Sequence, residues 1–209
     1  MKNAWLVRPY PHDIKRLDEF KQNNIVAIGW PGIGNLTGKS REDIKTILSG
    51  EPYNLTGLYL GNAYATIDIF VNRMAIGDLV LVPDGDDIYF CEITSDYYLD
   101  DVYDNNTDGY PHQRKVKWLS NTLRKDLSTP LRTSLKVHRA TADLSKHLEE
   151  INLLSQGREF TSTTDDYETI PVTYPLRPDF TVAFEIPTDM TKGEAKRLSL
   201  YIESLYFSE

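Results

Sequence analysis

Aromatic side chains near loops, with cations close by in the sequence, are the residues of this chain with the clearest chemical potential. Trp30 follows an apolar segment and lies in a Gly-rich loop. Such rings can stack on planar heterocycles, while neighbouring cations hold phosphate groups. A place in the core is the alternative for each ring, most of all for a ring inside an alternating strand. The candidates for stacking are Trp30, Tyr97, Tyr98, Tyr110 and Trp118.

Charge is distributed unevenly along the chain. The 209 residues carry a net charge of −8, which by itself argues against nucleic acid as a partner. Residues 84–108, however, contain nine Asp or Glu and no Lys or Arg, whereas residues 110–139 contain eight Lys or Arg against one acid. This basic segment either pairs with the acidic loop or forms a local phosphate-binding patch. The patch would consist of Arg114, Lys115, Lys117, Arg124, Lys125 and Arg132.

Motifs for catalysis, metals or cofactors are missing from the sequence. Its one cysteine, Cys91, lies in an apolar strand pattern and is expected to be a core residue. The four histidines do not have the spacing of metal ligands, and the acidic loop lacks the glycine and glutamate of a calcium-binding loop. The four glycines of residues 29–38 indicate either a tight turn or a backbone that approaches a ligand. We therefore expect a binding module without metal or cofactor rather than an enzyme.

Periodicity and capping signals indicate a mixed α+β chain. In the strand over 114–119, alternation places Arg114 on the face of Val116 and Trp118, and Lys115 and Lys117 on the other. Arg114 would then reach the rim of a pocket. Strands are expected over 4–7, 25–28, 79–82, 88–93, 114–119, 136–140 and 180–186. Helices are expected over 13–23, 40–50, 56–74, 143–154 and 191–206, with a short one from 128.

The sequence texture suggests three segments. Residues 1–154 contain most of the expected elements. Residues 155–179 are rich in Thr, Asp and Pro and are interpreted as a linker or surface connection. Residues 180–209 form a strand and an amphipathic helix that cannot bury their own apolar faces. This appendage must pack on the main domain, on a partner or on a second copy, and in the last case the chain forms a homodimer.

The sequence has neither the pattern of a membrane-spanning helix nor that of a signal peptide. No apolar run approaches 18 residues, and the first 13 residues lack the apolar centre of a signal peptide. A cytoplasmic protein without a membrane partner is therefore expected.

The order of the motifs resembles the PUA-like superfamily, and within it the EVE and YTH domains. Trp30 follows the second strand, and Gly77-Asp78 precedes the third. A strand ending in Cys91-Glu92-Ile93-Thr94 is followed by Val116-Lys117-Trp118-Leu119 and then by Pro130-Leu131-Arg132. The resemblance covers roughly residues 1 to 150.

This resemblance implies a fold and a function. The fold would be a twisted β-barrel surrounded by helices, with residues 180–209 as a separate strand–helix appendage. A pocket would hold a modified, methylated base flipped out of a nucleic acid, with Trp30 as one wall and Tyr97, Tyr98 or Tyr110 as the other. EVE-type domains at the N-termini of McrB-like restriction proteins imply DNA rather than RNA, a role in bacterial defence and a separate effector protein. The alternative is a β-barrel that binds a small molecule or a protein and has no nucleic-acid role.

Overall fold

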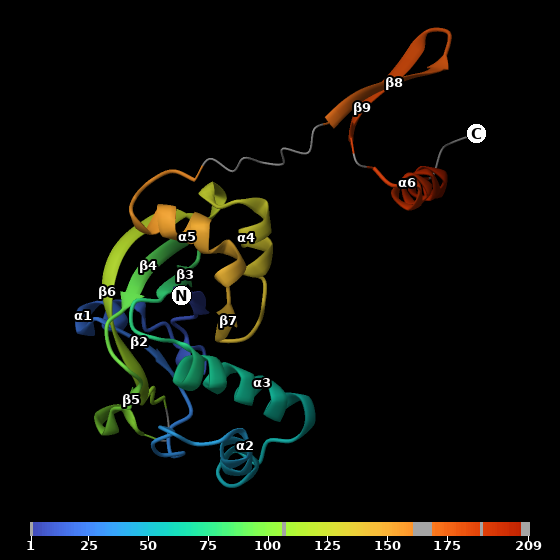
Figure 1. Cartoon of the computed structure of the whole chain (residues 1–209). Coiled ribbons are helices and arrows are strands. Elements are labelled where there is room, and N and C mark those ends of the chain that lie inside the picture. Colours follow the sequence, from blue (N-terminus) through green and yellow to red (C-terminus); the bar gives the residue numbers. More distant parts are fainter. Residues whose placement is uncertain (1, 106–107, 161–168, 189, 206–209) are drawn as a thin grey trace. The chain divides into compact units, whose positions relative to one another are not determined.

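The structure, a computed structural model, describes residues 2–105, 108–160, 169–188 and 190–205. It divides the chain into two compact units, residues 1–160 and 161–209 (Figure 1). The expected boundary at residue 154 therefore moves to residue 160, because Phe160 still packs against a core cluster of the first unit.

A seven-stranded sheet forms the centre of the first unit. Its strands run in the order β2-β6-β4-β3-β1-β7, and β5 pairs with β6. Of these pairs β1 and β3 are parallel and the others antiparallel. The strands are β1 (Ala4–Val7), β2 (Ile25–Ile28), β3 (Leu79–Asp84), β4 (Asp87–Ile93), β5 (Tyr98–Leu99), β6 (His112–Leu123) and β7 (Thr141–Asp143).

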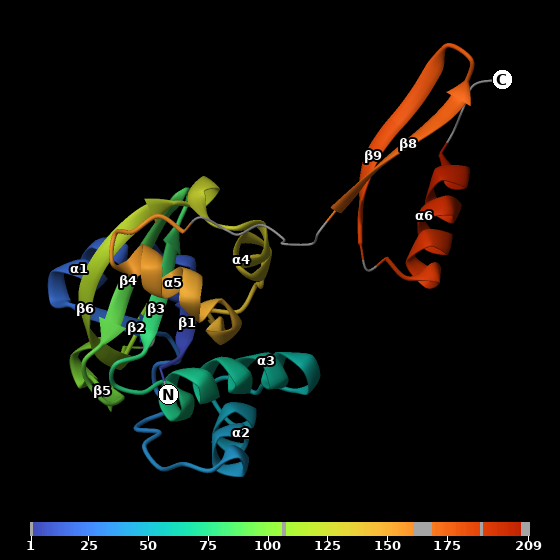
Figure 2. The ribbon, with the colours of Figure 1, turned by 45° about the horizontal axis from the view of Figure 1, so that its top comes forward.

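The long strand β6 makes the sheet curl (Figure 2). Residues 112–115 of β6 pair with β2, whereas residues 116–123 pair with β4 across a register shift at Phe90/Cys91. The result is an α+β half-barrel. It differs from the expected barrel in that β2 and β7 remain edge strands of the sheet among the described residues.

Side-chain caps begin two of the helices of the first unit. Ser40 and Asp43 form a capping box at α2, and Ser128 accepts a hydrogen bond from the Leu131 amide at α4. The helices of the first unit are α1 (Leu17–Asn23), α2 (Arg41–Ser49), α3 (Gly57–Asp68), α4 (Thr129–Ser134) and α5 (Leu148–Ser155). A π-helical turn, Ile69–Arg73, continues α3. In the part of the chain that is described, no helix combines the length and apolar character needed to span a membrane.

Three expected elements begin later than the sequence patterns suggest. The helix expected from residue 13 begins at Leu17, because His12 and Asp13 have left-handed backbones that a helix excludes. The strand expected over 136–140 is β7, three residues long, and the helix expected from residue 143 begins as a 3-10 turn at Ser145 before α5.

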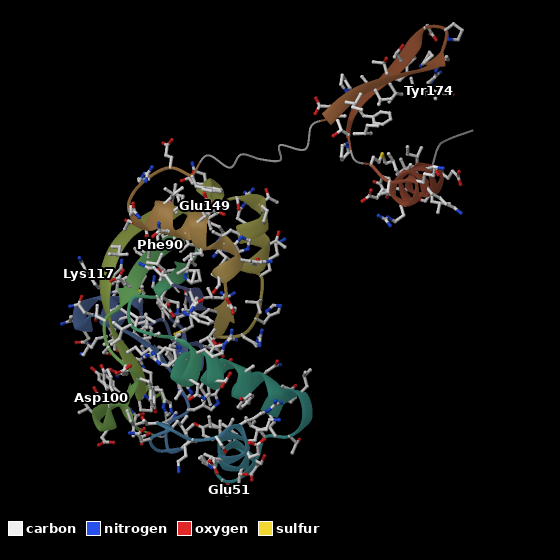
Figure 3. All side chains as sticks on the ribbon, in the orientation of Figure 1. Glu51, Phe90, Asp100, Lys117, Glu149 and Tyr174 are labelled. Atoms are coloured by element: carbon white, nitrogen blue, oxygen red, sulfur yellow. The ribbon has the colours of Figure 1, made fainter. Side chains whose placement is uncertain are left out.

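Successive residues of the strands face two separate cores, as the pleat of a strand requires. Leu6 and Phe90 lie in the cluster under α4 and α5 (Figure 3), whereas Trp5 and Cys91 lie in the cluster that includes residues of α2 and α3. Cys91 is fully buried, which raises the pKa of its thiol and confirms its expected place in the core.

The second unit is a hairpin followed by a helix. The hairpin pairs β8 (Thr169–Arg177) with β9 (Phe180–Pro187), and Thr191 caps α6 (Lys192–Ser204) through a capping box. The expected linker over 155–179 thus contains a strand. Pro171 and Pro175 argued against a strand in the sequence, because proline usually interrupts a sheet. Both strands of a two-stranded hairpin are edge strands, however, and edge strands tolerate proline.

Candidate functional site

A cavity of about 230 Å³ opens beside the end of β2. It is formed where four segments meet: the turn after β1, the end of β2, the segment before α3 and the segment before β7. We call it the aromatic pocket, because four of its ten lining residues carry aromatic rings. The residues that line it are Arg8, Tyr10, Pro11, His12, Ala27, Ile28, Gly29, Trp30, Tyr53 and Ala140.

Unusual backbone conformations concentrate at this pocket. Trp30 has φ of 67°, and His12 and its neighbour Asp13 have φ of 54° and 61°. A bulky side chain rarely adopts this left-handed conformation, which costs of the order of 1–3 kcal/mol per residue. Such strain persists only where surrounding contacts enforce it, and it gathers at functional sites.

The two tyrosines of the pocket direct their hydroxyl groups into the protein. The Tyr53 hydroxyl donates to the Pro31 carbonyl (2.8 Å), and burial raises the pKa of Tyr53 to about 12. The Tyr10 hydroxyl donates to Asp84 (2.5 Å), which is also paired with Lys15 (2.8 Å). With the hydroxyl groups engaged in this way, the aromatic carbons of both rings provide the contact surface of the pocket.

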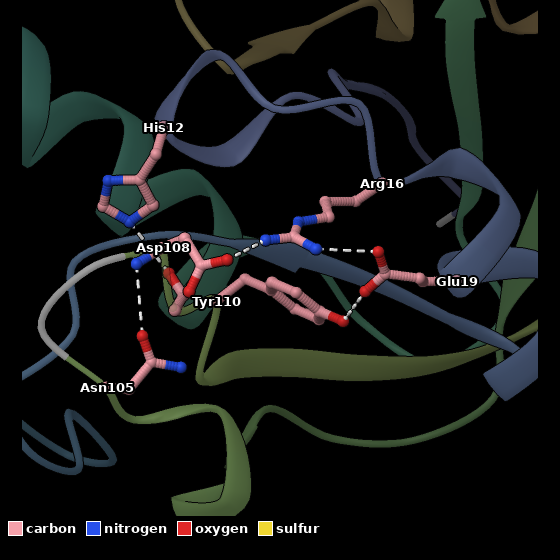
Figure 4. Close-up of polar contacts among 7 residues, drawn as sticks. His12, Arg16, Glu19, Asn105, Asp108 and Tyr110 are labelled. Atoms are coloured by element: carbon pink, nitrogen blue, oxygen red, sulfur yellow. Dashed lines mark hydrogen bonds and ion pairs between the residues drawn. The ribbon is translucent and has the colours of Figure 1, made fainter.

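A polar network fastens the acidic loop next to the pocket (Figure 4). Arg16 bridges Glu19 (2.8 Å) and Asp108, and the Tyr110 hydroxyl donates to Glu19. His12 Nε2 lies 2.9 Å from the Gly109 carbonyl. Hydrogen bonding and the Arg16 charge hold the pKa of Glu19 below its ordinary value despite burial. The acidic loop is therefore tied to the segment that carries His12.

Four of the five predicted stacking residues lie outside the aromatic pocket. Tyr97 and Tyr110 are buried, and Tyr98 hydrogen-bonds Gln113 (3.0 Å). Trp118 packs partly buried against two core clusters, with its Nε1 buried and unpartnered. Of the five, only Trp30 lines the pocket, and Tyr97, Tyr98 and Tyr110, the residues expected as a second wall, do not.

The other aromatic residues that line the pocket are Tyr10, His12 and Tyr53, which sequence reasoning missed. A signal was present for two of them, since Arg8-Pro9-Tyr10-Pro11-His12 places rings in a turn directly after a strand. For Tyr53 there was no such signal, because the neighbouring sequence does not indicate that residue 53 lies close to the end of β2.

Arg114 is buried, with 2% of its surface exposed. Its guanidinium donates to the carbonyls of Phe70 (2.8 Å), Val71 (3.0 Å) and Ser95 (3.2 Å), and burial lowers its pKa. The alternation predicted its inward face correctly. A phosphate contact or a place at a pocket rim does not fit this environment, and both expectations are corrected.

The other predicted cations lie nearer the surface. Lys115, Lys117 and Lys125 are exposed, and Lys117 extends from the outer side of β6 (Figure 3). Arg124 donates to the Gly85 carbonyl (3.1 Å) and Arg132 to Thr129 Oγ1 (2.9 Å). Among the described residues, no ion pair joins this basic segment to an acid of residues 84–108.

A second cavity has a volume of about 370 Å³, and one of its lining residues is the sequence neighbour of a residue that lines the aromatic pocket. Ala140 lines the aromatic pocket, and the adjacent Arg139 lines this second one together with Arg73 and Lys146, so we call it the cationic cavity. Arg73 is paired with Asp143 (2.6 Å), whereas Arg139 and Lys146 have no ion-pair partner among the described residues. Within those same residues, no cluster of His, Cys, Asp or Glu could hold a metal ion.

Fold and cavity together define an α+β domain with a ligand-sized aromatic pocket at the edge of a half-barrel sheet. The chain belongs to the family described as "Domain of unknown function (DUF8426)", whose model matches residues 8–141. No curated protein matches the chain. Among solved structures it is similar to the YTH domain of the Zygosaccharomyces rouxii MRB1 protein, determined in complex with N6-methyladenosine RNA. That similarity has 12% identity and a TM-score of 0.39, over 77% of this chain and 90% of that one.

Proposed function

We propose that residues 1–160 form a non-catalytic reader of nucleic acid that holds one flipped, methylated base in the aromatic pocket. The observation that carries this proposal is the pocket itself, which four aromatic residues line and strained backbone shapes. The resemblance of the sequence to EVE and YTH domains points to the same ligand class.

The size of the pocket suits a single ring system. Its 230 Å³ lies below the range of about 300–1,000 Å³ that is usual for drug-sized ligands. Stacking on an aromatic side chain contributes about 1–3 kcal/mol per base. A methyl group adds apolar surface to a base, and a pocket of aromatic carbons favours that addition over water.

The cationic cavity supports a path for the phosphate backbone. A base in the aromatic pocket would have its flanking phosphates close to the segment Arg139–Ala140, where Arg139 and Lys146 are without ion-pair partners among the described residues. We extend the proposal to these two cations as contacts for flanking phosphates. Lys115, Lys117, Arg124, Lys125 and Arg132 remain proposed for a longer strand.

The biological setting of the proposal comes from the sequence alone. It comprises DNA rather than RNA, bacterial defence in the cytoplasm and cleavage by a separate effector protein.

For the second unit we propose pairing with a second copy, since its hairpin exposes Tyr174 (61%), Phe180 (52%) and Phe184 (40%).

Titration of the full chain with short oligonucleotides tests the proposal. Single-stranded and duplex DNA and RNA with one methylated base are compared with their unmodified counterparts at low salt. We expect tighter binding of a methylated oligonucleotide, and an affinity about 5- to 150-fold weaker in Trp30→Ala, which corresponds to the stacking energy of one ring. Tyr98→Ala, which removes a half-buried ring outside the pocket, serves as the matched control.

Two results would count against this function. Absence of binding to every oligonucleotide would favour the alternative of a small-molecule or protein-binding domain. Equal weakening in Trp30→Ala and Tyr98→Ala would place the base elsewhere. Thermal melting of both variants separates these results from unfolding.

A further inference from the structure

Two residues of the loop that carries Trp30 form hydrogen bonds with one pair of buried side chains. His112 Nε2 lies 3.1 Å from the Trp30 carbonyl, and His112 Nδ1 lies 2.8 Å from the Tyr97 hydroxyl oxygen. That hydroxyl in turn accepts a hydrogen bond from the Leu36 amide (3.3 Å). Residues 30 and 36 are therefore linked through His112 and Tyr97.

Chemistry sets the direction of every hydrogen bond in this chain of groups. A carbonyl oxygen can only accept, so His112 Nε2 carries the proton and donates to Trp30. In a neutral imidazole the other nitrogen, Nδ1, is then an acceptor, and the Tyr97 hydroxyl donates a hydrogen bond to it. The amide of Leu36 donates to the same hydroxyl oxygen. Each hydrogen bond between these groups therefore joins one donor to one acceptor.

The surroundings keep His112 in this single state. His112 is 0% exposed, and burial lowers its pKa to about 4, so the ring is neutral at pH 7. The rings of Tyr97 and His112 stack with centroids 5.8 Å apart. His112 is also the first residue of β6. It pairs with Ile28 of β2, and Ile28 is two residues before Trp30 in the sequence.

We infer that His112 is the positioning residue of the aromatic pocket, holding Trp30 in its left-handed conformation through the Trp30 carbonyl, with Tyr97 fixing the imidazole. Trp30 needs such a restraint, because its φ of 67° is disfavoured for a bulky residue. The inference rests on the proposed function only for its effect on base binding. Its structural part concerns Trp30 alone.

Three substitutions in the full chain test the inference. Tyr97→Phe removes only the hydroxyl that accepts from Leu36 and donates to His112. His112→Leu removes both ring nitrogens while keeping apolar volume. His112→Gln restores an acceptor and a donor on one planar group. Tyr98→Phe is the matched control, because it removes a neighbouring hydroxyl that bonds Gln113 instead.

The primary measurement is the NMR signal of the Trp30 indole N–H, assigned by its disappearance in Trp30→Phe. We expect this signal to shift or broaden in Tyr97→Phe and His112→Leu and to return towards wild type in His112→Gln. The signals of Trp5 and Trp118 should stay in place. Unchanged Trp30 signals in folded Tyr97→Phe would overturn the inference, and this variant decides the matter if His112→Leu fails to fold.

Binding supplies the second measurement. Discrimination of the methylated oligonucleotide should weaken about 5- to 150-fold in Tyr97→Phe, as expected when a buried hydrogen-bonding group is left without its partner, and should be retained in Tyr98→Phe. If no oligonucleotide binds the wild-type protein, the proposed function fails, whereas a Trp30 signal that follows His112 still supports the positioning role. If binding is intact in Tyr97→Phe although the Trp30 signal has moved, His112 does not set the base site.

Discussion

Gly29 lies against the ring of His12. A Cβ atom at position 29 would come within 3.1 Å of His12 Nε2, the same nitrogen that lies 2.9 Å from the Gly109 carbonyl. Gly29 does not have a left-handed backbone, so its role is to leave space. The absence of a side chain lets the imidazole form one side of the aromatic pocket and reach the acidic loop at the same time.

Gly29→Ala should therefore impair the pocket more than the fold. The added methyl group displaces the His12 ring by a few tenths of an ångström and strains its hydrogen bond with Gly109. We expect weaker oligonucleotide binding with a decrease in stability of no more than about 1 kcal/mol. Gly61→Ala in α3, where a Cβ meets no atom within 4 Å, is the control and should bind normally. Equal binding by the two variants would show that His12 does not contact the ligand.

Charge reversal should separate phosphate-binding cations from other exposed cations. If Arg139 and Lys146 bind phosphates, reversing both to Glu weakens binding for all sequences alike and lowers the salt slope by about 1 for each phosphate that is no longer neutralised. Reversing Lys115 and Lys117 tests the same proposal for the outer side of β6. The measurement is the dissociation constant at four or more salt concentrations. A pair whose reversal leaves the slope unchanged does not belong to the nucleic-acid-binding surface.

Stability should fall on acidification because of His112. Its folded-state pKa of about 4 lies below the ordinary value of 6.5, so between these pH values the unfolded chain binds a proton that the folded chain does not. The free energy of unfolding then decreases from pH 6.5 towards pH 4 by up to roughly 3 kcal/mol. His147, whose pKa burial also lowers, acts in the same direction.

Denaturant titrations at pH 7, 6 and 5 measure this dependence. His112→Gln, which cannot titrate, should show a flatter profile than wild type, with His147 and the carboxylates supplying the remainder. Identical profiles for the two proteins would mean that His112 does not control acid stability.

A chain that ends at residue 160 should retain the binding site. Every residue that lines the aromatic pocket or the cationic cavity precedes residue 147, and the second unit begins after Phe160. We expect unchanged oligonucleotide binding together with the disappearance of any self-association, measured by titration and by sedimentation. Failure of a well-folded truncated protein to bind would place part of the site in residues 161–209.

Local signals predicted most of the framework. The capping boxes that begin at Ser40 and Thr191 depend on side chains within three residues of one another, and the structure confirms both. The left-handed backbones at His12 and Asp13 carry no such signal, since neither residue type requires that conformation, and they displaced the start of α1.

The candidate site could be predicted only in part, because it is assembled from distant segments. Trp30 was identified from a ring placed in a polar loop. Tyr97 and Tyr110 have similar sequence surroundings, yet long-range packing buries them, while Tyr53 reaches the pocket through a hydrogen bond to Pro31. Arg114 shows the same effect for charge, because the three carbonyls that accept from it lie on segments 19 to 44 residues away.

The Arg8 amide donates to the Ala140 carbonyl (2.8 Å), where β1 ends and the chain enters β7. All residues that line the aromatic pocket lie within the stretch that these two residues bound, and the family model spans nearly the same stretch, residues 8–141. The pocket is complete only while both ends of this stretch are docked. A molecule held there would act as a non-covalent cross-link between them, opposing the separation of β1 from β7 by an amount that grows with its concentration.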